Sequence, residues 1–161
     1  MNKQCLVCGS EIRKDYRFMD LLGIKRGKFD LCVICKFEIH PIHEQDGRIE
    51  IVYDRNSFMH DFLYRYKDCG DYLWRYVLSG TLSEELPFSK KEWVWAVHPG
   101  EEYVGACGYW PLGELLLAAG FSPKKIGMKE LAQVEGRIVC AMEKKELEGL
   151  GKKNRGICLV N

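Results

Sequence analysis

The chain has 161 residues, of which 47% are hydrophobic, and this is enough to bury the core of one domain with a small additional module. Its 24 basic and 23 acidic residues give a net charge of +1 at pH 7, so overall charge does not predict binding to nucleic acid or to an anionic membrane. No apolar run reaches the roughly 18 residues of a membrane span, and no secretory signal precedes the first cysteine. We therefore expect a cytoplasmic protein that does not enter a membrane.

Two Cys-x-x-Cys pairs stand near the beginning of the chain. Cys5 and Cys8 form the first pair, and Cys32 and Cys35 form the second after a spacer of 23 residues. Each pair presents two thiolates on the same side of a turn, and two such turns supply the four ligands of a tetrahedral zinc ion. We predict a zinc ribbon over residues 1–43 that holds a structural Zn²⁺ ion. A site whose four ligands are all protein side chains leaves no position for a catalytic water.

The spacer between the pairs is weakly apolar. Residues 16–24 predict a short helix that is too small to fold alone, so metal binding is expected to stabilise this module. His40 and His43 are interpreted as ordinary loop residues, with a role as alternative ligands left open. The other four cysteines lack ligand spacing and are predicted to be buried thiols in a reducing compartment, with a catalytic thiol as an alternative. They are Cys69, Cys107, Cys140 and Cys158.

A polar turn at residues 44–47 separates the ribbon from a second predicted domain, residues 48–161. Alternating polar and apolar residues predict a strand over residues 48–53. Residues 54–57 then break the strand and supply candidate caps for a helix. Apolar residues at helical spacing predict that this helix runs from Phe58 to Tyr66.

Basic and aromatic residues alternate at the end of this helix and in a second helical pattern over residues 72–78. The candidate binding residues are Arg65, Tyr66, Lys67 and Arg75. Such a mixture is typical of surfaces on which single-stranded nucleic acid stacks its bases. The alternative is an ordinary amphipathic helix, in which the aromatic residues are core and the charges are solvated.

A short apolar run over residues 93–97 predicts a strand that is buried on both faces of a parallel sheet. In open α/β sheets, ligands bind beyond the carboxyl ends of the strands, so His98, Glu101 and Glu102 stand where a site is expected. The alternative is a plain turn that ends the strand. A further helix is predicted over residues 112–119.

The last forty residues have weaker patterns. Residues 138–140 are a short apolar stretch, and residues 142–148 predict an exposed, charged helix. Residues 149–156 are interpreted as a basic, flexible segment that is solvated, with a phosphate or nucleic-acid contact as the alternative. Residues 157–160 predict a final strand.

The order of these features resembles the ComFC-like competence proteins, the ComF family of phosphoribosyltransferase-like proteins. The similarity is closest from Tyr53 to Asp71, where Arg65-Tyr66-Lys67 and Gly70-Asp71 match the motif of the family. Looser similarity covers Leu82–Leu86, Trp93–Val97 and Ala118–Phe121. The resemblance implies an α/β fold, in which an N-terminal zinc ribbon precedes a partial type I phosphoribosyltransferase-like parallel sheet with flanking helices.

The chain departs from the family in its second half. Cys107–Pro111 keeps only a glycine and an aromatic residue of the Arg-Gly-Phe-Asn-Gln segment of the family, and residues 142–146 resemble its basic segment faintly. The loop that binds phosphoribosyl pyrophosphate is absent, since no acidic pair followed by a Thr-Thr-Gly-like turn occurs after Trp93. In the family, backbone amides of that loop surround a phosphate. We interpret the chain as a truncated or degenerate relative, in which residues 122–161 are either folded or altered by truncation.

The resemblance implies a non-catalytic accessory protein of DNA uptake in natural transformation, located in the bacterial cytoplasm. Its implied partners are single-stranded DNA and the competence helicase, and no catalytic residue is assigned. A second hypothesis is a phosphoribosyltransferase that uses phosphoribosyl pyrophosphate and Mg²⁺. A third is a zinc-ribbon adaptor that binds another protein. An incomplete sheet would leave an open edge, which a protein partner is expected to cover.

Overall fold

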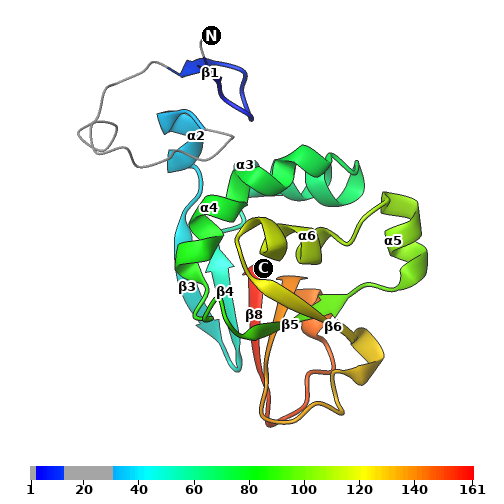
Figure 1. The fold of residues 1–161 in the computed structure, drawn as a ribbon. Helices are drawn as coiled ribbons and strands as arrows, with labels where there is room; N and C mark the ends of the chain where they lie inside the picture. Colours follow the sequence, from blue (N-terminus) through cyan, green and yellow to red (C-terminus); the bar gives the residue numbers. More distant parts are fainter. Residues whose placement is uncertain (1–2, 13–30) are drawn as a thin grey trace. The chain divides into compact units, whose positions relative to one another are not determined.

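The computed structural model describes residues 3–12 and 31–161. The chain divides into two compact units, Met1–Glu38 and Ile39–Asn161 (Figure 1). The helix predicted over residues 16–24 lies outside the described residues. None of the helices in the described part of the chain has the length and apolarity that crossing a membrane requires.

The described residues of the first unit form short elements that position cysteines. Strands β1 (Lys3–Gln4) and β2 (Glu11–Ile12) pair in an antiparallel manner. Between them the chain turns tightly: Cys5 N–H donates to Ser10 O at 2.8 Å, and Gly9 has a φ of 70°, which glycine adopts without steric cost. Helix α2 (Val33–Phe37) begins directly after Cys32, whose sulfur accepts a hydrogen bond from Cys35 N–H. Both turns therefore place a Cys-x-x-Cys pair at a backbone reversal.

The second unit is built on a six-stranded sheet with the order β3-β4-β8-β7-β5-β6. All neighbouring strands are parallel except the β3–β4 pair. The strands are β3 (Pro41–Asp46), β4 (Ile49–Tyr53), β5 (Trp93–His98), β6 (Ser122–Gly127), β7 (Ile138–Glu143) and β8 (Arg155–Val160). The α/β class with a mostly parallel sheet and flanking helices is therefore confirmed. The last two strands lie in the centre of the sheet, so residues 122–161 are part of the folded unit.

Strand β3 occupies residues that the sequence pattern assigns partly to a polar turn. Glu44, Gln45 and Asp46 pair with β4, and the chain reverses afterwards at Gly47 and Arg48. Gly47 has a φ of 59°, as the first position of a two-residue hairpin turn commonly requires. The prediction of a turn over residues 44–47 is thus wrong except at its last residue, because an exposed edge strand tolerates an all-polar sequence.

Helices cover one face of the sheet (Figure 1). They are α3 (Ser57–Leu63), a π-helical turn η1 (Tyr64–Asp68), a 3₁₀ turn η2 (Tyr72–Trp74), α4 (Arg75–Glu85) and α6 (Pro111–Ala118). Helix α5 (Glu101–Cys107) lies to the side of the sheet and has no buried residue. Helix α3 begins as predicted: the side chain of Asn56 accepts a hydrogen bond from Met59 N–H at 2.8 Å. Residues Glu101 and Glu102, expected in a loop, form the first turn of α5 instead.

An aromatic cluster fills the core beneath these helices. The rings of Phe62 and Tyr66 are 5.3 Å apart, those of Phe62 and Trp74 are 6.3 Å apart, and all three side chains are buried. The hydroxyl of Tyr66 donates to Pro111 O at 2.7 Å, which joins η1 to the start of α6. A buried tyrosine hydroxyl needs such a partner, because an unpaired one costs free energy. The tilted rings are the geometry that aromatic pairs prefer.

The opposite face of the sheet is covered by short segments rather than long helices. A cluster of buried residues includes Val97, Ile126, Val139 and Cys158 from the strands, with Leu131, Leu147 and Leu150 from the connections. The connections carry the 3₁₀ turns η3 (Met128–Glu130) and η4 (Lys144–Leu147). The sheet is therefore a buried middle layer, and its central strands are apolar on both faces.

Two predictions for the C-terminal part are wrong. Residues 142–148 do not form an exposed helix: Met142 and Glu143 complete β7 and are buried, and only a 3₁₀ turn follows. The segment 149–156 is not a flexible tail, because Asn154 is 1% exposed and fixes it. The Asn154 amide donates to Val134 O, and its oxygen accepts from Arg137 N–H at 3.1 Å.

Close packing around Trp110 generates a prediction about stability. A Cβ placed on Gly113 would overlap three ring atoms of Trp110, one of them 2.7 Å away. The ring is held in place, since its Nε1–H donates to Val97 O at 3.0 Å. We expect Gly113→Ala to lower the free energy of unfolding by about 1–3 kcal/mol, measured by urea denaturation.

Gly80 in α4 is the matched control for this substitution. A Cβ on Gly80 would meet no atom within 4 Å. We expect Gly80→Ala to raise stability by about 0.5–1 kcal/mol, because alanine loses less backbone entropy in a helix than glycine does. Equal effects of the two substitutions would contradict the packing described for Trp110.

Candidate functional site

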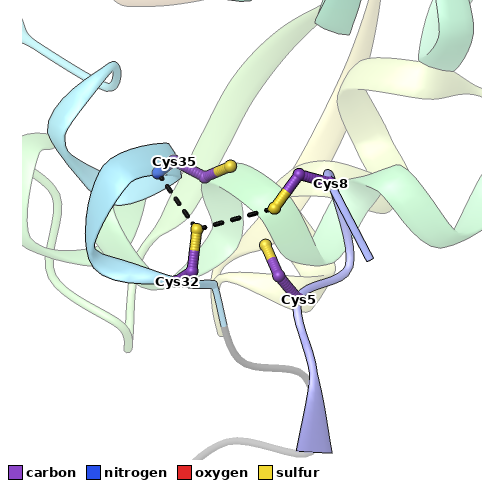
Figure 2. Close-up of side chains that lie close together, drawn as sticks. All are labelled: Cys5, Cys8, Cys32 and Cys35. Atoms are coloured by element: carbon purple, nitrogen blue, oxygen red, sulfur yellow. Dashed lines mark hydrogen bonds between the residues drawn. The ribbon is translucent and has the colours of Figure 1, made fainter. Parts of the chain in front are cut away.

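Four cysteines of the first unit converge on one point (Figure 2). The sulfur atoms of Cys5, Cys8, Cys32 and Cys35 all lie within 4.8 Å of one another. Cys5 and Cys8 come from the turn between β1 and β2, and Cys32 and Cys35 from the start of α2. The sulfurs of Cys8 and Cys32 are 3.6 Å apart. The arrangement can hold a metal ion, as the two Cys-x-x-Cys pairs predict.

The environments of the four thiols differ. Cys8 is exposed, and hydrogen bonds from the side chain and backbone of Ser10 lower the pKa of its thiol to about 6. Burial raises the pKa of the Cys35 thiol well above its ordinary value. A bound cation is what would allow a buried thiol such as Cys35 to ionise, since metal ligation by cysteine requires the thiolate. Four sulfur donors of this kind suit a thiolate-preferring metal in a closed tetrahedral site.

A cleft of about 690 Å³ lies at the carboxyl edge of the parallel sheet in the second unit. Its walls come from residues that follow four different strands: Arg55 after β4, Pro99 after β5, Met128 after β6 and Lys145 after β7. The π-helical turn η1 supplies a further wall, and such turns are frequent at functional sites. Both the position and the size are typical of ligand sites in α/β sheets.

Lys67 dominates the charge distribution of this cleft. Its ammonium lies 2.5 Å from a Glu143 carboxylate oxygen and 2.8 Å from one of Glu146, and all three side chains are nearly buried. Burial acts to raise the pKa of Glu143, but hydrogen bonds and charge from Lys67 and Lys145 outweigh it and leave the pKa below its ordinary value. Burial likewise acts to lower the pKa of Lys67. Charge and hydrogen bonds from Glu146 and Glu143 outweigh it and leave the pKa of Lys67 above its ordinary value. The raised pKa of Lys67 and the lowered pKa of Glu143 both favour the charged form of this ion pair at neutral pH.

The four predicted binding residues occupy different environments. Tyr66 is fully buried and Lys67 is paired with two carboxylates, so both hold the fold together around the cleft. Arg65 is exposed, with its guanidinium 5.2 Å from the centre of the Trp74 ring. Arg75 is half-buried, 3.4 Å from the centre of the Tyr72 ring. Only the two arginines remain at the surface.

The predicted site after β5 is partly assembled. His98 is 7% exposed, and its Nε2 has no hydrogen-bond partner within the described part of the chain. Nδ1 of His98 accepts from Gly100 N–H at 3.2 Å, and Nε2 lies 3.7 Å from a Glu101 oxygen. Glu101 also lies 3.6 Å from Lys125. Glu102 is exposed at the surface of α5 and is not part of this group.

Glu143 and Glu146 are the site residues that the sequence pattern does not reveal. Glu146 turns back on its own backbone, since one carboxylate oxygen accepts from Met142 N–H at 2.9 Å and Glu143 N–H at 3.3 Å. A sequence signal does exist in the apolar run Ile138–Met142, whose length suits a buried strand and places Glu143 at its carboxyl end.

Fold and site define the chain as an α/β protein with a mostly parallel sheet and, near its N-terminus, a four-cysteine cluster suited to a metal ion. Among curated proteins it is similar to Competence protein ComFC of Streptococcus pneumoniae (strain ATCC BAA-255 / R6), with 26% identity. The match covers 94% of this chain and 74% of that protein. The resemblance to ComFC-like proteins is therefore confirmed, at modest identity. No protein-family profile matches the chain. No solved structure matches it significantly.

The cysteine cluster gives a prediction about metal content. We expect the double variant Cys5→Ser and Cys8→Ser to lose the bound metal, because two of four ligands are removed and hydroxyls are poor substitutes for thiolates. Metal content by mass spectrometry and the far-ultraviolet spectrum of the purified protein provide the measurement. The cooperative unfolding of the second unit should persist. The control is Cys69→Ser, outside the cluster, and unchanged metal in the double variant would refute the assignment.

Lys67 gives a second prediction. Lys67→Met leaves Glu143 and Glu146 without their main counter-ion, so we expect a loss of about 3 kcal/mol at pH 7. The deficit should shrink as the pH falls to 5, because removing the cation raises the pKa of Glu143 and protonation then neutralises it. In the unmodified protein the lowered pKa of Glu143 has the opposite effect: its contribution is present above the ordinary glutamate range and is lost as the pH falls through the lowered value.

Urea denaturation at the two pH values measures both effects. Lys145→Met is the control, since Lys145 lies 3.2 Å from Glu143 but is 67% exposed. Exposed ion pairs contribute at most about 1 kcal/mol, so this change should be small. A pH-independent deficit in Lys67→Met would mean that packing of the lysine stem, and not its charge, stabilises the cleft.

Proposed function

We propose that the protein is a non-catalytic accessory protein of DNA uptake in natural transformation, which binds single-stranded DNA and a helicase partner in the cytoplasm. The observation that carries this proposal is the similarity to Competence protein ComFC, which extends over 94% of the chain. A match of that extent includes most of the second unit and its parallel sheet. A competence-related role follows from that similarity, and the finer assignments depend on the arguments below.

Zinc is the metal in this proposal. Zn²⁺ has no geometric preference of its own and commonly occupies closed tetrahedral sites of four cysteines. The two Cys-x-x-Cys pairs provide such a donor set, with Cys5 and Cys8 in the first and Cys32 and Cys35 in the second. Because every ligand is a protein side chain, the ion would stabilise the first unit and would take no part in a reaction.

The charge pattern of the cleft supports a non-catalytic protein. A phosphoribosyl pyrophosphate site needs cations and backbone amides that are free to meet phosphate oxygens. In the cleft described above, Lys67 is paired with two carboxylates and Lys145 with one, and Arg55 donates to Asn161 O at 2.8 Å. These pairs reduce the positive potential that an anionic ligand would experience. The cleft therefore favours the accessory role over a transferase.

Binding of a protein partner is supported by the edge of the sheet. All six residues of β3 are exposed, and no strand among residues 3–12 and 31–161 pairs with its outer side. An open edge of this kind can add a strand from another chain. This is the surface at which we place the helicase partner, and the same edge would serve a zinc-ribbon adaptor.

Binding of single-stranded DNA is the testable core of the proposal. We expect a fluorescently labelled single-stranded oligonucleotide to bind the purified protein at low salt, with an affinity that falls as salt increases because counterions are released. A duplex of the same sequence should bind more weakly, since its bases cannot stack on protein side chains. Fluorescence anisotropy over a salt series measures both. Absence of binding at low salt would remove the DNA part of the proposal, and a pull-down with the helicase would then test the adaptor role alone.

A further inference from the structure

The face of the sheet opposite the helices carries two tryptophans near the amino ends of the strands. Trp93 and Trp95 alternate with buried Val94 along β5, so their side chains point to the same face. Trp95 is half-buried against the cluster of Val97 and Val139. Trp93 is 68% exposed, in contrast to the prediction of a strand buried on both faces.

Two basic side chains stand beside Trp95. Lys124 is paired with Trp95 in the parallel register of β5 and β6, and its ammonium lies 4.5 Å from the centre of the indole ring. The guanidinium of Arg137, just before β7, lies 5.6 Å from the same ring. Both side chains are exposed, and neither forms an ion pair with any residue of the segments 3–12 and 31–161.

The two cations stand on the same face of the sheet, on either side of β5. With β5 between β6 and β7, Lys124 and Arg137 are two inter-strand spacings apart, or about 10 Å. Arg155 begins β8 beside Arg137 but does not belong to this group, because the next residue, Gly156, faces Leu147 and Leu150 of the buried cluster and alternation directs Arg155 to the helical face. The spacing of Lys124 and Arg137 suits a short piece of an extended polyanion better than a single small anion.

The combination of these side chains indicates the kind of partner. The centres of protein–protein interfaces are depleted of charge, whereas here two cations without an ion-pair partner flank the ring of Trp95. An exposed indole with cations alongside is what a single strand needs, because bases stack on the ring and phosphates contact the cations. A duplex offers the phosphates without the unpaired bases. Charge and aromatic character together thus favour a single-stranded nucleic acid over a protein or a duplex.

We propose that the surface formed by Trp93, Trp95, Lys124 and Arg137 binds single-stranded nucleic acid, with a base stacked on Trp93 and phosphates contacted by the two cations. This inference rests on the proposed DNA-binding function for the identity of the ligand. It locates the binding on the sheet face and not on the helical surface of Arg65 and Arg75, which the sequence motif favours.

Fluorescence anisotropy with a labelled oligothymidylate tests the location. We expect Trp93→Ala to weaken binding about fivefold or more, whereas Trp93→Phe should retain most of it, because phenylalanine also presents a stacking face. Lys124→Ala should weaken binding and lower the salt-dependence slope by about 0.7, the value for one phosphate contact on a single strand. Binding should also quench the emission of Trp93, and Trp93→Phe should lose that quenching while it still binds.

Two variants serve as matched controls. Leu117 lies on α6 and is 54% exposed. Leu117→Ala removes this apolar side chain and should not change the affinity for the oligonucleotide. Arg65→Ala removes an exposed cation from the helical surface, and we expect a smaller effect than that of Lys124→Ala. Thermal denaturation of each variant verifies that it is folded, as expected for substitutions of exposed residues.

The outcomes separate the inference from the proposed function. If the unmodified protein binds no oligonucleotide at low salt, both are overturned. If it binds and the Trp93→Ala and Lys124→Ala variants bind equally well, the proposed function stands and the location on the sheet face is wrong. If Trp93→Ala instead abolishes self-association without changing oligonucleotide binding, the face is a contact between copies of the chain, and the inference is equally refuted.

Discussion

The fold of the second unit depends on the parallel pairing of its last strand. Strand β8 lies between β4 and β7, so β4 near the beginning of the unit has no parallel neighbour until residues 155–160 are in place. In the register of β8, Cys158 pairs with Ile51 of β4 on one side and with Ala141 of β7 on the other. Parallel pairing of segments that are about a hundred residues apart has a high loop-closure cost, and it is compensated by burial of strands that are apolar on both faces.

The ion group of Lys67, Glu143 and Glu146 connects this central sheet to the helical layer. Lys67 belongs to η1, and Glu143 is the last residue of β7. The same turn contributes Tyr66, whose hydroxyl bonds to Pro111 O, so adjacent residues of one motif attach η1 to two different elements. The match of Arg65-Tyr66-Lys67 to the ComFC-like motif is thereby explained through architecture: two of its three residues stabilise the packing that forms the walls of the cleft.

The sequence predicts most of the elements whose patterns are local. Strand β4, helix α3 with its Asn56 cap, strand β5 and helix α6 follow from periodicity and capping residues. The cysteine cluster follows from spacing alone. These predictions succeed because the information lies within about ten residues of each element.

The failures occur where a distant residue changes the local preference. Residues 142–148 have high helix propensity, but β7 extends to Glu143 because Lys67, 76 residues away, neutralises its carboxylate. The same reason explains segment 149–156, whose basic composition suggests a solvated tail until Asn154 meets Val134 O. Strand β3 shows the reverse case, in which polar residues form a strand because their side chains are exposed at an edge.

The pairing of charges, and not their number, is what distinguishes the two surfaces of the second unit. A net charge of +1 says little about binding, because each cation acts over about 8 Å in physiological salt. In the cleft at the carboxyl edge, Lys67 and Lys145 are neutralised by nearby carboxylates, so a polyanion gains little by approaching them. On the sheet face, Lys124 and Arg137 contact an indole ring instead of a carboxylate, and their charge remains available to phosphate. Since an aromatic ring polarises toward a cation without cancelling its charge, a cation–π contact orients the side chain and leaves it competent to bind an anion. The same two residues therefore hold Trp95 in position and extend positive charge beside exposed Trp93, which is the combination that recognition of an unpaired strand requires.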